Sequence, residues 1–188
     1  MKPVEPECVV IGASAGAFDA LLAILPALPA GFRLPVIVVV HIPPGKRSLL
    51  ADIFRSRCRL SVGEAEDKEP IRSGMIYFAP PDYHLLVERD KSLSLSRDAP
   101  ILFSRPSIDV LFESAAEAYG LALIAVVLTG GNQDGALGLS SVKAVGGTAL
   151  VQDPREAFAP AMPEAALRVC PDAHILSLDA IARYLREV

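Results

Sequence analysis

The chain has 188 residues, of which 52% are hydrophobic but only 6% are aromatic, so aliphatic side chains must supply most of the core. Its 18 basic and 22 acidic side chains give a formal net charge of −4, which argues against binding to nucleic acid or to an anionic membrane surface. The longest aliphatic run, Leu121 to Leu128, is far shorter than the roughly 20 residues that span a bilayer. We therefore expect one domain over residues 1–188, located in the cytoplasm, with no nucleic-acid partner and no membrane insertion.

Short β-branched runs alternate with segments of helical period along most of the chain. This alternation is typical of strand–helix–strand units, which build a parallel sheet covered by helices on both faces. In chain order it predicts a strand at 8–13, a helix at 17–28, a strand at 35–42, a helix at 47–57, a helix at 108–119, a strand at 121–129, a helix at 134–145, a strand at 148–153, a helix at 163–169, a strand at 174–178 and a terminal helix.

The middle of the chain has a different texture. Residues 75–78 and 84–88 are short apolar runs, and residues 92–96 alternate strictly between serine and leucine. Such patterns are typical of antiparallel strands at a half-exposed edge. The predicted fold is therefore α/β, a doubly wound and mostly parallel sheet with helices on both faces and a small antiparallel hairpin annex.

Polar residues that follow the strands are the first candidates for a site, because open α/β sheets bind ligands beyond the carboxyl ends of their strands. Ser14 lies in the sequence GASAG between a predicted strand and a predicted helix. Small neighbours allow a sharp turn that holds a serine hydroxyl outward, as in a nucleophile elbow. The alternative is that Ser14 only caps the helix. A dinucleotide-binding loop would need glycine at this position.

His41 follows five consecutive apolar residues, so a buried strand would deliver it to the same edge as Ser14. A histidine in such a place can serve as a general base, or it can simply hydrogen-bond a backbone group at the strand end. His84 and His174 are the other two histidines, and we interpret both as structural. His174 begins the last predicted strand, at the edge opposite to the candidate site.

Asp134 follows the predicted strand at 121–129 and the pair Gly130–Gly131. It can orient a catalytic histidine, or it can cap the helix that it precedes. Asp153, which ends the next predicted strand, is a rival carboxylate. The two glycines offer backbone N–H groups of the kind that an oxyanion hole needs.

One Ser, one His and one Asp at three strand ends fit a nucleophile, a general base and an orienting acid. Their order along the chain differs from that of α/β-hydrolases, but such triads are defined by geometry and role. We predict a hydrolase site made of Ser14, His41 and Asp134. No cofactor is expected, and no metal either, because no cluster of Cys and His is present to hold one.

Six separated stretches of the sequence stand out in this order: IGASAGAFDAL, VVVHIPPG, GMIYFAPPDYHLLV, SRPSIDVLFESAA, VVLTGGNQDGALGL and GGTALVQDPREAFAPAMPEAAL. Together they resemble the catalytic domain of the chemotaxis protein-glutamate methylesterase family, CheB. The resemblance covers about residues 7–185. It implies that Ser14 is the nucleophile, His41 the base and Asp134 the orienting acid.

The resemblance also implies a substrate. Family members hydrolyse glutamate γ-methyl esters on the cytoplasmic helical bundle of chemoreceptors, release methanol, and deamidate receptor glutamines. The methylated receptor is therefore the expected partner, together with a separate regulatory protein. The backbone N–H groups of Ala15 and Gly131 are the expected oxyanion donors, since Ala15 adjoins the nucleophile and Gly131 lies in the aspartate loop, the part of VVLTGGNQDGALGL that leads to Asp134.

The sequence departs from the family pattern at four positions around the site, namely Ala15, Ala17, Gly131 and Asn132. An esterase of the same fold with another protein or small ester as substrate therefore stays open, as does a non-catalytic signalling module. Only seven residues precede the first predicted strand. We therefore expect no N-terminal receiver domain, so that the enzyme is constitutive, controlled by another protein, or cut from a longer chain.

Overall fold

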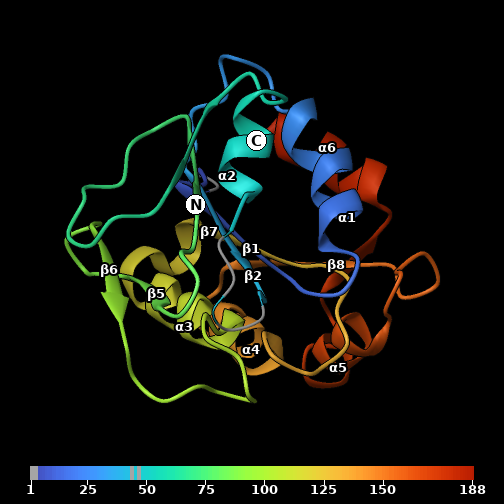
Figure 1. The fold of residues 1–188 in the computed structure, drawn as a ribbon. Coiled ribbons are helices and arrows are strands. Elements are labelled where there is room, and N and C mark those ends of the chain that lie inside the picture. Colours follow the sequence, from blue (N-terminus) through green and yellow to red (C-terminus); the bar gives the residue numbers. More distant parts are fainter. Residues whose placement is uncertain (1–3, 43–44, 46–47) are drawn as a thin grey trace.

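A seven-stranded sheet runs through the molecule in the computed structural model, which describes residues 4–42, 45 and 48–188 (Figure 1). Every strand is parallel to its neighbours, which the alternating pattern predicts for five of the seven strands. The order across the sheet is β3 (Ser61–Glu64), β4 (Met75–Phe78), β2 (Val36–Val40), β1 (Cys8–Ala13), β7 (Leu123–Val127), β8 (Thr148–Gln152) and β9 (His174–Leu176).

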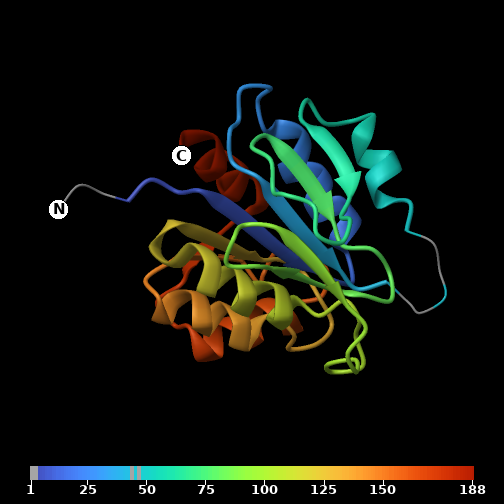
Figure 2. The ribbon, with the colours of Figure 1, turned by 90° about the vertical axis from the view of Figure 1, so that its left-hand side faces the viewer.

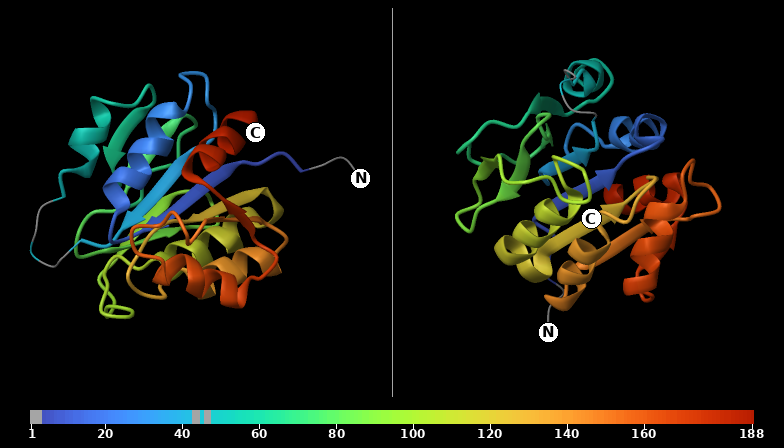
Figure 3. Two further views of the ribbon diagram at one scale, coloured as in Figure 1. Left: turned by 90° about the vertical axis from the view of Figure 1, so that its right-hand side faces the viewer. Right: turned by 60° about the horizontal axis from the view of Figure 1, so that its bottom comes forward.

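Helices cover both faces of this sheet, which confirms the doubly wound prediction (Figure 2). One face carries α1 (Ala17–Ile24), α2 (Leu50–Arg55) and α6 (Leu178–Glu187). The other carries α3 (Ile108–Tyr119), α4 (Ala136–Ala144) and α5 (Ala161–Val169), as both views of Figure 3 also show.

The aliphatic core is divided in two by the sheet. Strands β1, β2 and β7 are buried along their whole length, because helices lie on both sides of them. Successive side chains of β1 point to opposite faces, so Val10 joins the core under α3 while Val9 and Ile11 join the core under α1. This packing fixes the carboxyl ends of the three central strands, where the candidate residues lie.

The predicted annex is a two-stranded antiparallel sheet of β5 (His84–Val87) and β6 (Leu93–Ser96). It packs against α3, where the Val87 amide donates to the Ser114 hydroxyl (3.1 Å). The prediction was wrong for residues 75–78, which form the parallel strand β4 inside the main sheet. Ile76, Tyr77 and Phe78 are all buried, and a continuous apolar run marks a strand that is covered on both faces.

Other differences concern the ends of helices. The helix predicted at 17–28 ends at Ile24 and continues as a short 3₁₀ turn, Leu25–Ala27, because Pro26 has no N–H to donate and its ring obstructs the preceding turn. The helix predicted at 47–57 is present as Leu50–Arg55, and residue 47 lies outside the described residues. No helix in the described part of the chain has both the length and the apolar character needed to cross a membrane.

Candidate active site

Three adjacent strands bring Ser14, His41 and Asp134 to one edge of the sheet. Strands β2, β1 and β7 lie side by side, and the residues that follow them are joined by backbone hydrogen bonds. The His41 amide donates to the Ala13 carbonyl (3.2 Å), and the Ser14 amide donates to the Thr129 carbonyl (2.9 Å). The chain reverses its winding direction at β1, and ligands bind at such a point in doubly wound sheets.

Ser14 sits in a tight turn between β1 and α1. The Ser14 carbonyl accepts from the Ala17 amide (2.9 Å), and Gly16 has φ = +82°, a conformation that favours glycine. A side chain at Gly16 would also collide with Phe158, whose Cβ would lie 2.6 Å from the added Cβ. No side chain caps α1, so the interpretation of Ser14 as a helix cap is wrong. Ser14 instead lines a pocket.

His41 and Ser14 line the same pocket, which has a volume of about 370 Å³. Asn132, Arg105 and Phe103 also line it. The aspartate loop therefore contributes to the pocket through Asn132, one of the positions that departs from the family pattern.

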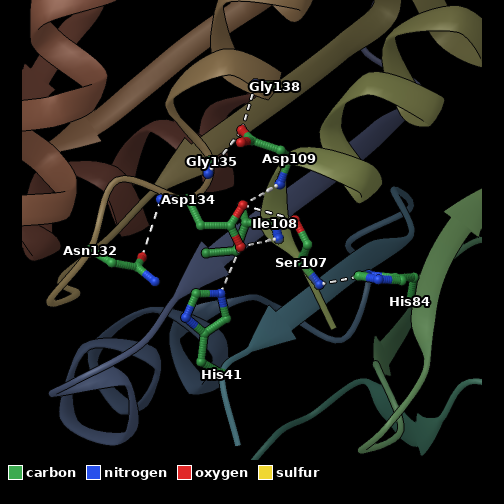
Figure 4. A network of polar contacts seen from close by, with 9 residues as sticks. All are labelled: His41, His84, Ser107, Ile108, Asp109, Asn132, Asp134, Gly135 and Gly138. Atoms are coloured by element: carbon green, nitrogen blue, oxygen red, sulfur yellow. Dashed lines mark hydrogen bonds and ion pairs between the residues drawn. The ribbon is translucent and has the colours of Figure 1, made fainter. Parts of the chain in front are cut away.

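The His41 ring is tied to Asp134 by a hydrogen bond of 2.7 Å from Nε2 to Oδ2 (Figure 4). Asp134 is fully buried, whereas the side chain of His41 is 10% exposed. Each carboxylate oxygen accepts two hydrogen bonds. Oδ2 accepts from His41 and from the Ile108 amide (2.7 Å), while Oδ1 accepts from the Ser107 hydroxyl (2.9 Å) and the Asp109 amide (3.0 Å).

Asp134 therefore caps a helix, but not the helix that it precedes. Its carboxylate lies at the N-terminus of α3, where it accepts from the Ser107 hydroxyl and from the Ile108 and Asp109 amides, which have no partner within the helix. Backbone N–H groups and the helix dipole favour negative charge at this position. The first residue before α4 is Gly135, which makes no side-chain cap.

The protonation state of the pair follows from these contacts. Burial alone would raise the pKa of Asp134, but the hydrogen bonds from His41 and from the Asp109 and Ile108 amides outweigh it and hold the pKa below its usual value. An ionised carboxylate only accepts hydrogen bonds, so His41 Nε2 carries the proton. In the neutral ring, Nδ1 is then the free acceptor.

Asp109 makes the reciprocal contact with α4. Its Oδ1 accepts from the amides of Gly135 (2.9 Å) and Gly138 (2.7 Å), at the start of that helix (Figure 4). Helices α3 and α4 thus exchange carboxylates, Asp134 at one N-terminus and Asp109 at the other. Burial, together with the nearby charge of Asp134, raises the pKa of Asp109 to about 6 against the opposing effect of the Gly138 and Gly135 amides.

His84 belongs to the same network, which sequence reasoning did not foresee. The ring is almost fully buried; its Nε2 hydrogen-bonds the Ala99 carbonyl (3.1 Å), and its Nδ1 accepts from the Ser107 amide (3.1 Å). Because the amide only donates and the carbonyl only accepts, these two partners fix the neutral tautomer with the proton on Nε2. A chain of contacts therefore runs from His84 through Ser107 to Asp134.

The backbone donors around the pocket are only partly free. The Gly130 amide, expected to be available, donates to the Ala159 carbonyl (2.9 Å) and cannot serve a ligand. The amides of Ala15 and Gly131 donate to no atom within the described parts of the chain. Thr129 holds the serine loop, residues 14–16 between β1 and α1, in place, since its hydroxyl donates to the Ala15 carbonyl (2.8 Å).

The remaining sequence candidates lie elsewhere. Asp153 is paired with Arg155 (2.6 Å) rather than with a histidine, and His174 is exposed at the amino end of β9. Ser107 and Arg105 carried no local signal of their own, and only the stretch SRPSID in the resemblance pointed to them. Among the residues that the structure describes, no three His, Cys, Asp or Glu side chains lie together as a metal site requires.

Comparison with known proteins agrees with this geometry. The family model "CheB methylesterase" matches residues 9–185. A protein of Leptospira interrogans is 48% identical over 94% of this chain and 91% of its own length. A protein-glutamate methylesterase/protein-glutamine glutaminase of Trichodesmium erythraeum is 41% identical over 78% of this chain, which corresponds to 43% of that longer protein.

The solved structure of the Thermotoga maritima CheB methylesterase catalytic domain superposes on the chain with a TM-score of 0.91. The two are 37% identical, and the match covers 98% of this chain and 99% of that domain. Sequence and fold therefore agree over almost every residue, and the chain belongs to the CheB methylesterase family.

Proposed function

We propose that the chain hydrolyses glutamate γ-methyl esters on proteins and releases methanol, with Ser14 as nucleophile, His41 as general base and Asp134 as orienting acid. The observation that carries this proposal is the 2.7 Å hydrogen bond between His41 and a buried, ionised Asp134, beside Ser14 in one pocket. The family membership and the names of the relatives support the same reaction.

The reaction begins when Ser14 Oγ attacks the ester carbonyl and His41 takes the hydroxyl proton on Nδ1, the nitrogen that Asp134 leaves free. The C–O bond to the methoxy group then breaks, and the proton on His41 leaves with methanol. Water attacks the resulting acyl-enzyme, again giving a proton to His41, and the glutamate carboxylate is released as Ser14 regains its proton. Glutamine deamidation follows the same steps with ammonia as the leaving group.

Asp134 stabilises the imidazolium that forms twice in this cycle. Its other three hydrogen bonds, all from the N-terminus of α3, keep the carboxylate from rotating toward solvent. The free amides of Ala15 and Gly131 are the proposed oxyanion donors. Such a donor typically contributes about 3–4 kcal/mol to transition-state stabilisation.

The proposed substrate is the cytoplasmic helical bundle of a methylated chemoreceptor, which also places the reaction in the cytoplasm. Residues 1–188 would act there as one catalytic domain, with a separate regulatory protein as a further partner. The substitutions at Ala15, Ala17, Gly131 and Asn132 leave Ser14, His41 and Asp134 unchanged, which favours a conserved reaction over a non-catalytic role.

Methanol release from a methylated receptor fragment tests the proposal. Ser14→Ala is expected to abolish release while the circular dichroism and the unfolding midpoint stay unchanged, because the Ser14 hydroxyl makes no hydrogen bond to any residue that the structure describes and its removal leaves no polar group without a partner. Wild-type protein should also react with a serine-directed phosphonate, and Ser14→Ala should not. Full methanol release by Ser14→Ala would exclude Ser14 as the nucleophile. Turnover of small esters without any methanol from the receptor fragment would instead indicate an esterase with another substrate.

A further inference from the structure

The exposed phenylalanines of this protein all gather around the candidate active site. The chain has seven phenylalanines, and four of them are buried in the core. The other three, Phe18, Phe103 and Phe158, are 39%, 100% and 82% exposed. We call these three residues the phenylalanine rim.

Each member of the rim reaches the serine loop from a different segment. Phe103 lines the pocket that contains Ser14 and His41, and Phe18 lines a neighbouring pocket that also includes Ser14. Phe158 packs directly over Gly16, two residues after Ser14. Three segments that lie far apart in the sequence therefore each place a phenylalanine next to the loop that carries Ser14.

Phe103 is held outward by an unusual turn. The amide and carbonyl groups of Ile101 and Ser104 hydrogen-bond each other (3.0 and 2.8 Å), which leaves Leu102 and Phe103 at the tip. Both tip residues have positive φ, +47° and +65°, where Asn and Gly are usual. The segment around residue 100 projects from the body of the molecule in Figures 2 and 3. A bulky apolar pair that the turn itself disfavours points to a role in binding.

We infer that the phenylalanine rim is the docking surface for the protein that carries the ester. This inference rests on the proposed function. The ester carbon of a γ-methyl glutamyl residue lies only three bonds from its Cα, so the backbone of the substrate must come close to Ser14. Residues that stand at the mouth of the pocket must then contact the substrate protein, whereas a small ester would pass between them.

The chemistry of the rim fits such a partner. Aromatic side chains at the centre of an interface exclude water and carry much of the binding free energy. Exposed phenylalanines next to the loop of one reactive serine suit the apolar flank of a helix that presents a glutamyl ester. The occupant is therefore a folded protein surface.

Phe103→Asn is the sharpest test, because asparagine suits the positive φ and removes only a fully exposed ring. We expect kcat/KM for a methylated receptor fragment to fall about tenfold, mainly through KM, and to fall by a larger factor than kcat/KM for p-nitrophenyl acetate. Phe158→Ala should lower the activity on the receptor fragment in the same way. Leu121→Asn is the matched control, since Leu121 is 56% exposed next to the amino end of β7, whereas the site lies beyond the carboxyl end. This variant should leave both activities unchanged.

Three results would overturn the inference while leaving the proposed function intact. Equal losses on both substrates would mean that Phe103 shapes the pocket, and full activity on the receptor fragment would mean that the rim does not dock it. A wild-type dimer that becomes monomeric in Phe103→Asn would assign the rim to self-association instead. Absence of methanol release by the wild type would refute the proposed function, and the inference with it.

Discussion

The replacement of Asp134 by asparagine should damage both folding and catalysis, because each carboxylate oxygen accepts two hydrogen bonds. An asparagine has one accepting oxygen, and its NH₂ group must face a backbone amide in either orientation. The orientation that keeps the contact with His41 directs NH₂ toward the Asp109 amide. A buried amide without an acceptor costs about 1–3 kcal/mol, and the loss of negative charge at the N-terminus of α3 adds about 0.3–1 kcal/mol.

We therefore expect Asp134→Asn to lower the free energy of unfolding by about 1–4 kcal/mol in urea titrations. Methanol release should fall by about 10⁴-fold, since the imidazolium of His41 loses its counter-charge. The rate should be measured at a temperature and urea concentration at which the variant is fully folded, so that the two effects are separated.

Asp109→Asn is the matched control for this experiment. Both hydrogen bonds to Asp109, from Gly135 and Gly138, end on the same oxygen, so an asparagine can keep them. This variant should stay folded and retain activity within about tenfold. If Asp134→Asn were as stable and as active as Asp109→Asn, the assignment of Asp134 as orienting acid and as cap of α3 would be wrong.

Three further predictions concern residues around this network. The pKa of Asp109 is raised from 3.8 to about 6 in the folded state, so folding favours the protonated carboxyl. The stability that this raised pKa contributes is fully present below pH 4 and is lost as the pH rises through 6. Asparagine does not titrate, so in urea titrations Asp109→Asn should gain stability relative to wild type between pH 4 and pH 6. His84→Asn keeps an acceptor for the Ser107 amide, whereas His84→Gln keeps a donor for the Ala99 carbonyl. The two variants should lose similar stability, but His84→Asn should preserve kcat and His84→Gln should lower it. Equal kcat values for the two variants would show that His84 has a structural role only. Gly12→Ala places a methyl group 2.2 Å from Ile108 Cγ2 and should lower the unfolding free energy by about 1–3 kcal/mol, and an unchanged urea midpoint would contradict that close packing.

The strands that carry the site could be read from the sequence because their signal is local. A parallel strand covered on both faces needs an uninterrupted aliphatic run, and β1, β2 and β7 have one. The positions of Ser14 and His41 directly after such runs therefore followed from the sequence. Strand β3 escaped prediction because Val62 is its only buried residue. Strand β4 was assigned to the wrong sheet, because a run of four apolar residues is too short to distinguish a strand in a parallel sheet from one in an antiparallel hairpin.

The contacts of the site, in contrast, were decided by the tertiary structure. From the sequence, Asp134 was a candidate cap for the helix that follows it. In the folded protein its carboxylate instead caps α3, where it accepts from the amide of Ile108, a residue 26 positions earlier in the sequence. The exchange of carboxylates between α3 and α4, and the link from His84 through Ser107, depend on how these elements pack. A sequence pattern specifies which face of a strand or helix is buried, because that depends on neighbouring residues. It does not specify which distant donor a buried carboxylate will meet, because that depends on the packing of helices against one sheet.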